Sequence, residues 1–162
     1  MPSDPRIQLL LLALDQAFDH HGWHGPVLWG ALRGVSVKQA LWRPAAGRNC
    51  IHDLVYHCAY WKYGVRRLVS GQIEGKFARS PANFPRRDAP LNEKQWKQDL
   101  ALLKNEHERL RALVASLDAA DLNKRSAKKR WTFLEMIHGV AAHDLYHTGQ
   151  ISLLKRLMKS SK

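Results

Sequence analysis

The chain has 162 residues, of which 45% are hydrophobic, and its formal net charge is +12. This length and apolar content predict a single domain, residues 1–162, with a hydrophobic core of its own. The apolar run at residues 9–14 is too short to span a membrane, which takes about 18 apolar residues, and no signal-peptide pattern surrounds it. We therefore expect neither a signal peptide nor a membrane span in this sequence. With only two cysteines, it favours a reducing, cytoplasmic location.

The positive charge lies mainly at the ends of expected helices. Basic residues gather at 66–67, 86–87, 124–130 and 155–162. Cations near a helix C-terminus complement the helix dipole, so much of the excess charge has a structural explanation. Nucleic-acid binding through a basic surface is therefore only a lesser alternative.

Apolar residues recur at helical spacing in four main segments, and no segment alternates as a strand would. The first helix is predicted at residues 5–20, and it can resume at 27–32 after a break rich in glycine. The second is predicted at 49–69, with Asn49 as its N-cap. The third starts near Asn92, and the fourth covers residues 131–158. These segments predict an all-α, up-down four-helix bundle.

Residues 71–90 contain three prolines and form the longest stretch without periodicity. A loop of about twenty residues in a compact domain is usually functional or disordered. The aromatic residues Phe77 and Phe84 favour a loop packed over another part of the molecule, and its role is left open.

Two histidines four residues apart, His143 and His147, lie within the fourth predicted helix. At this spacing both imidazoles face the same side of a helix and can reach one ion. They also fall in a stripe that predicts the inner face of this helix: Met136, Val140, His143, His147, Gln150, Leu154 and Leu157.

A third histidine, His57, falls on the predicted inner face of the second helix, in the series Cys50, Leu54, His57, Trp61, Gly64 and Leu68. In a bundle, a histidine from a neighbouring helix can complete a metal site. Three neutral imidazoles leave a coordination position open for water or substrate, which is typical of a catalytic site. Imidazole ligands do not identify the ion, and we expect zinc or nickel.

The chain resembles the DinB/YfiT-like superfamily of four-helix-bundle proteins. In that family one histidine of the second helix and an H-x3-H pair of the last helix form the metal site, and His57, His143 and His147 match these positions. The similarity also covers Trp42-Arg43-Pro44, Trp96 and the Gly-Gln-Ile-x-Leu-Leu-Lys-Arg run at 149–156. It implies the bundle fold, with crossover connections as in relatives, and a homodimer.

The resemblance implies chemistry less directly than fold. Characterised relatives include thiol-dependent isomerases and transferases. A metal-dependent enzyme would activate a low-molecular-weight thiol or water for transfer to, isomerisation of, or hydrolysis of a small electrophilic substrate. The alternative is a metal-binding stress-response or interaction module without catalysis. Residues alone do not decide between these functions.

Four other polar residues have roles to be tested against the structure. Asp53 could orient His57 or interact with the helix N-terminus, and Gln150 could bond near the site or bridge helices. His107 lies on the apolar face of the third helix and could be a fourth ligand or a proton carrier, but it is interpreted as a hydrogen-bonded core residue. His52 is interpreted as a surface or capping residue.

Overall fold

The computed structural model describes residues 4–72, 76–78, 80, 83–84, 91–126 and 130–160. Over these residues the chain is helical and contains no β-strand, so the predicted all-α bundle is confirmed. Its four long helices are α1 (Pro5–Phe18), α4 (Ile51–Ser70), α5 (Glu93–Ala115) and α6 (Phe133–Ser160). Two short helices, α2 (Leu28–Leu32) and α3 (Val37–Leu41), and a 3₁₀ helix, η1 (Ala119–Asn123), lie in the connections.

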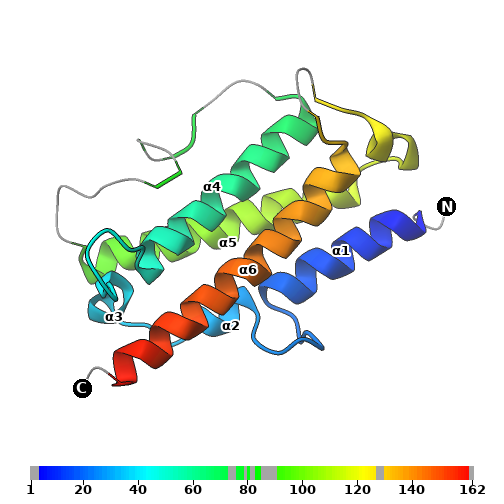
Figure 1. Cartoon of the computed structure of the whole chain (residues 1–162). Helices are drawn as coiled ribbons and strands as arrows, with labels where there is room; N and C mark the ends of the chain where they lie inside the picture. Colours follow the sequence, from blue (N-terminus) through cyan, green and yellow to red (C-terminus); the bar gives the residue numbers. More distant parts are fainter. Residues whose placement is uncertain are drawn as a thin grey trace.

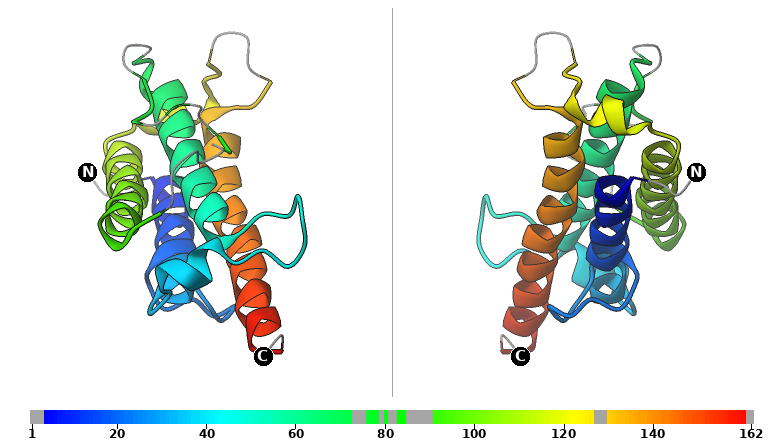
Figure 2. Two further views of the ribbon diagram at one scale, coloured as in Figure 1. Left: turned by 90° about the vertical axis from the view of Figure 1, so that its left-hand side faces the viewer. Right: turned by 90° about the vertical axis from the view of Figure 1, so that its right-hand side faces the viewer.

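The four long helices lie side by side, with α4 packed against both α5 and α6 (Figures 1 and 2). Figure 1 shows that α4 and α5 run in the same direction, opposite to α1 and α6. The connection between α4 and α5 therefore crosses from one end of the bundle to the other. The bundle has a crossover at this point instead of a strict up-down order.

Side-chain caps explain where the long helices begin. Asp4 accepts a hydrogen bond from the backbone of Arg6 at the start of α1, and Asn92 forms a capping box with Gln95 at α5. The N-cap of α4 is Cys50, one residue after the predicted Asn49. The backbone N–H of Cys50 donates a hydrogen bond to the carboxylate of Asp53 in the first turn of the helix. A carboxylate is favoured at this position because the N-terminus is the positive end of the helix dipole.

Polar pairs connect the helices, three of them within an otherwise apolar core. A fourth pair, between Asp15 of α1 and Arg111 of α5, lies at the edge of the core, at 2.6 Å between Oδ1 and Nε, with the Arg111 side chain 44% exposed. The other three pairs involve α4: His52 with Asp99, Arg66 with Glu106, and Lys62 with Asp144. Since a buried charge is costly without a partner, each pair favours one register of its two helices.

The inner faces of α4 and α6 differ from the predicted stripes. Every residue from 51 to 59 is buried, so the first half of α4 is enclosed on all sides, whereas Trp61 is 42% exposed. On α6 the buried set is shifted, with Asp144 fully buried and Leu157 39% exposed. Periodicity therefore identified the helices correctly, but the buried face of each of these two helices differs from the predicted one. Within the described ranges, no helix has the length and apolar character needed to cross a membrane.

Candidate metal centre

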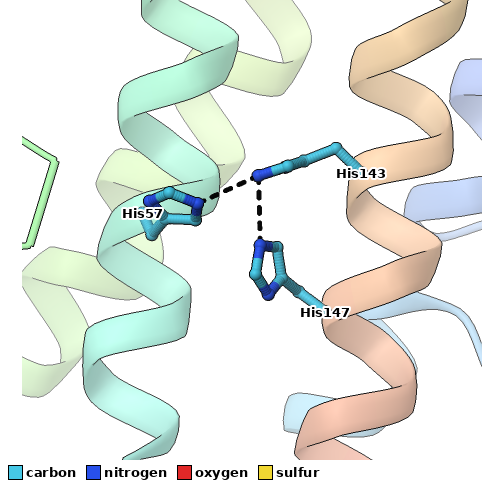
Figure 3. A group of neighbouring side chains, drawn as sticks. All are labelled: His57, His143 and His147. Atoms are coloured by element: carbon cyan, nitrogen blue, oxygen red, sulfur yellow. Dashed lines mark hydrogen bonds between the residues drawn. The ribbon is translucent and has the colours of Figure 1, made fainter. Parts of the chain in front are cut away.

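Three histidines from α4 and α6 converge in the interior of the bundle. The Nε2 atom of His143 lies 3.0 Å from Nε2 of His57 and 3.0 Å from Nε2 of His147, and Figure 3 draws both contacts. His143 and His147 reach this point together because they are one helical turn apart. His57 approaches from the facing helix (Figure 3). The structure thus brings together the three residues that the sequence singled out.

Amide oxygens orient two of the three rings. Nδ1 of His57 lies 2.6 Å from Oδ1 of Asn83, and Nδ1 of His147 lies 2.7 Å from Oε1 of Gln150. An amide oxygen only accepts hydrogen bonds, so in both rings Nδ1 carries the hydrogen and Nε2 keeps its lone pair. This is the tautomer in which Nε2 can bind a metal.

The geometry fits a single divalent ion. Four-coordinate zinc with Zn–N bonds of about 2.05 Å separates its nitrogen ligands by about 3.3 Å. The observed 3.0 Å contacts would need to open by only a few tenths of an ångström. The lone pairs of His57 and His147 both point at the same nitrogen of His143, an arrangement that a cation at their centre would stabilise. The three rings therefore form a group that could hold a metal ion.

Burial keeps the imidazoles neutral. It lowers the pKa of His57 to about 4, with a further contribution from nearby His147. Burial likewise lowers the pKa of His143 to about 3, and that of His147 is also lowered. Metal ligation requires the neutral ring, so protons compete weakly for these nitrogens at pH 7.

A second group of metal-ligand types lies directly behind His143. Cys58, His143 and Asp144 each place one ligand atom within 4.8 Å of the other two. The thiol is unsuited to binding a cation here because burial raises the pKa of Cys58 well above its ordinary value. The carboxylate of Asp144 already accepts a hydrogen bond from Lys62, whose ammonium would repel a metal ion. These contacts favour a polar buried cluster over a second metal site.

A cavity of about 710 Å³ opens beside the histidines, between α4 and the first half of α6. His57 and His143 form part of its wall, and the exposed rings of Trp61 and Trp131 also line it. Its one lining carboxylate, Glu135, is held at the start of α6 by the backbone N–H and hydroxyl of Thr132, at 2.7 and 2.8 Å. Among the described residues, no lysine or arginine lines this cavity. The cavity is thus mostly apolar, with two of the candidate ligands in its wall.

The side chains of the other polar residues that the sequence analysis considered, apart from Gln150, do not contact the three histidine rings. The carboxylate of Asp53 caps α4 and pairs with Arg43, so its contacts are those of the helix start, the second of the two roles considered. His107 is buried, as predicted, with its ring stacked 3.8 Å from that of Phe18. The prediction for His52 is wrong: it is buried and bonds Asp99 at 2.9 Å.

Sequence reasoning missed Asn83, Lys62 and Asp144 near the site. Asn83 comes from the long connection after α4 and lies against His57. Phe84 of the same connection packs over another part of the molecule, as its aromatic character predicted, with its ring stacked 4.1 Å from the imidazole of His57. The rest of that connection lies largely outside the described residues, with 73–75, 79, 81–82 and 85–90 left out. Lys62 and Asp144 were missed because charged residues are rarely fully buried.

The family of the chain follows from comparison with known proteins. Searches of curated proteins and of solved structures found no significant match. A family model for the DinB superfamily matches residues 22–151, which include all three histidines. This match covers most of the chain, and the helical bundle and its histidine cluster agree with it. The chain therefore belongs to the DinB superfamily.

Proposed function

We propose that this protein binds one divalent transition metal, zinc or nickel, through His57, His143 and His147. We further propose that it is an enzyme that uses the ion to activate a low-molecular-weight thiol or water. The activated nucleophile would attack a small electrophilic substrate, with transfer, isomerisation or hydrolysis as the outcome. The observation that carries the proposal is the meeting of three Nε2 atoms in the wall of an apolar cavity.

The chain's own residues would prepare the site in two ways. Asn83 and Gln150 hold Nδ1–H of their histidines, so the rings need no reorientation on binding an ion. Burial keeps all three imidazoles neutral, so they bring no negative charge to the site. A divalent ion held there would supply the positive charge that lowers the pKa of a coordinated thiol or water.

The volume and lining of the cavity favour a compact, uncharged and apolar substrate. Its volume of about 710 Å³ is within the range of small-molecule sites, roughly 300–1,000 Å³. The rings of Trp61 and Trp131 offer flat apolar surfaces, and Glu135 would repel an anion. An aromatic or unsaturated electrophile fits this lining better than a polyanion.

The metal is tested by elemental analysis of untagged protein purified without chelators, with His57→Ala and His143→Ala as variants. His138→Ala is the matched control, since His138 lies exposed on the same helix. We expect about one equivalent of zinc or nickel in the parent and control, and none in the two variants while they stay helical. A parent that holds no metal and cannot be loaded with either ion would refute the proposal.

The catalytic part is tested with cobalt-substituted protein. We expect its visible spectrum to change when a small thiol is added, and metal removal to abolish turnover of apolar electrophiles. If the metal stabilises the protein but thiols leave the spectrum unchanged and no turnover is found, the non-catalytic metal-binding module is the better interpretation.

The cavity is tested by filling it. Gly139 lines the cavity, and a Cβ built there meets no atom within 4 Å, so Gly139→Leu should fold and occupy part of the space. Gly149→Leu, on the same helix but away from this cavity, is the control. We expect Gly139→Leu to bind metal normally and to lose turnover of large substrates first. Equal effects of both variants would argue against the cavity as the substrate site.

We also propose that the protein is a homodimer. Tyr146 and Leu153 are 64% and 55% exposed and lie seven residues apart on α6, so they share one face of the helix. Light scattering coupled to gel filtration should give twice the chain mass of 18.6 kDa. Tyr146→Glu together with Leu153→Glu should give the monomer, and a monomeric parent would contradict the proposal.

A further inference from the structure

The three histidine rings of the candidate metal centre are not oriented alike. His57 and His147 each donate Nδ1–H to an amide oxygen. Nδ1 of His143 is buried and has no hydrogen-bond partner among the described residues. A histidine that binds a metal usually donates its other ring N–H to an acceptor, which fixes its tautomer and orientation. The acceptor for His143 is the missing part of this site.

One other unpaired acceptor is buried next to it. Asp144 follows His143 on α6 and is fully buried, with Oδ2 bonded to Lys62 of α4. Its second oxygen, Oδ1, has no partner in the described part of the chain. A ring nitrogen of His143 and a carboxylate oxygen of Asp144 lie within 4.8 Å of each other. One water molecule bridges such a span with two hydrogen bonds of about 2.8 Å.

We propose that Asp144 is the positioning residue of His143, accepting its Nδ1–H across one bridging water. This inference rests on the proposed metal site and adds a carboxylate to it. Nε2 of His143 already faces the other two imidazoles, so Nδ1 is the nitrogen left to bond. With the hydrogen held at Nδ1, Nε2 presents its lone pair to the ion, as in the other two rings.

Lys62 explains how a carboxylate can serve this role in the core. Both side chains of the Lys62–Asp144 pair are 0% exposed. The ammonium balances the carboxylate and also lies 3.4 Å from Nδ1 of His107, so it has a second acceptor. One oxygen of Asp144 is thereby engaged by Lys62, and the other is left for His143. An isolated buried carboxylate would be too costly for the fold.

Cys58 is the competing acceptor. Its Sγ also lies within 4.8 Å of the same atoms of His143 and Asp144. A neutral thiol is a weak acceptor, and burial keeps this thiol neutral. A carboxylate is much the stronger partner for an imidazole N–H.

The test uses a variant that removes the acceptor without leaving a buried charge. Lys62→Met with Asp144→Leu replaces the ion pair by apolar side chains of similar size, a change that folded proteins often tolerate. The matched control is Arg66→Met with Glu106→Leu, which removes the buried pair between α4 and α5. Cys58→Ala tests the competing acceptor. Asp144→Asn is a second variant that keeps the side-chain shape, with Lys62 expected to hold the amide oxygen and the NH₂ group left to face His143.

Two measurements are made on each protein. In the zinc-loaded state, proton and nitrogen-15 NMR of the imidazoles at pH 7.5 reports how fast the Nδ1–H of His143 exchanges with water. We expect slow exchange in the parent, the control and Cys58→Ala, and faster exchange in the double variant and in Asp144→Asn. Competition with a chelator should show zinc affinity reduced about 10- to 100-fold in the same two variants.

The proposal is overturned if the folded double variant keeps the slow exchange of the His143 Nδ1–H and binds zinc within twofold of the parent. It is also overturned if Cys58→Ala alone reproduces the change. Should the double variant fail to fold, Asp144→Asn decides by the same criteria. A parent that binds no zinc would refute the proposed function and this inference with it, whereas a parent that binds zinc, with variants that match it in both measurements, would refute only the role of Asp144.

Discussion

The Lys62–Asp144 pair permits a quantitative prediction about stability. Lys62→Met removes the ammonium but leaves the carboxylate of Asp144 in a position with no solvent exposure. Breaking a buried ion pair from one side costs about 3–5 kcal/mol, because the remaining charge is uncompensated. A domain of this size is stable by about 5–15 kcal/mol in total, so the loss is a large fraction. With a urea m value of about 2 kcal/mol/M, the unfolding midpoint should fall by about 2 M.

The loss should depend on pH with a definite sign. Burial raises the pKa of the Asp144 carboxyl, and in the parent Lys62 opposes this effect. Without Lys62, the folded variant holds a proton on Asp144 at pH values where the unfolded chain does not. A raised pKa gives stability that is present below the unfolded value, 3.8, and is lost as pH rises through the folded value. The difference between variant and parent should therefore shrink as pH falls from 8 to 5.

The assay is urea unfolding followed by circular dichroism, with parent and variant measured side by side in chelator at each pH. Lys62→Met with Asp144→Leu is the companion variant and should recover most of the lost stability at pH 7.5, since neither charge remains. A Lys62→Met variant that loses less than about 1 kcal/mol at pH 7.5, or a loss that is independent of pH, would refute this reasoning, because it would mean that bulk solvent or another cation compensates the charge of Asp144.

Three further predictions concern the site and its helices. Gln150→Leu should weaken zinc binding about tenfold or more in a chelator competition, because Nδ1 of His147 loses its acceptor, while Ser152→Ala should not. Metal-free protein should lose stability as pH falls from about 6.5 toward 4, since the folded pKa values of His57 and His143 are about 4 and about 3 and the unfolded chain takes up protons first. A variant with alanine at all three histidines should show a shallower slope in urea unfolding, and the part that remains is due to His107, since burial lowers its pKa to about 3. Gly149→Ala should raise stability by up to about 1 kcal/mol in the same assay, because the added Cβ meets no atom and alanine favours the helix; an unchanged midpoint would contradict this reasoning.

The sequence predicted which histidines meet better than it predicted their surroundings. Helical spacing was enough to select His143, His147 and His57, since local periodicity and the order of the helices decide which side chains can meet. The acceptor for His57 is Asn83, which stands at a positive φ of 53° in a stretch without periodicity. A contact made by an irregular segment depends on tertiary packing, so spacing could not reveal it.

The buried faces were less predictable than the helices themselves. The stripe through Trp61 and Leu157 assumed that the most apolar face is the inner one. In the structure the interior accepts Lys62 and Asp144 instead, because each neutralises the other across α4 and α6. Pairing is a property of two helices together, and a periodicity measured along one helix cannot detect it.

The placement of this ion pair also bears on the proposed chemistry. Lys62 and Asp144 together add no net charge near the histidines, and the three imidazoles are neutral. A divalent ion would therefore keep its full charge in an apolar setting, where electrostatic attraction for an anionic nucleophile is strongest. Had Asp144 been a direct ligand, its negative charge would have reduced that attraction. A carboxylate held one water away and balanced by Lys62 can orient His143 and still leave the ion's charge available to activate a thiol or water.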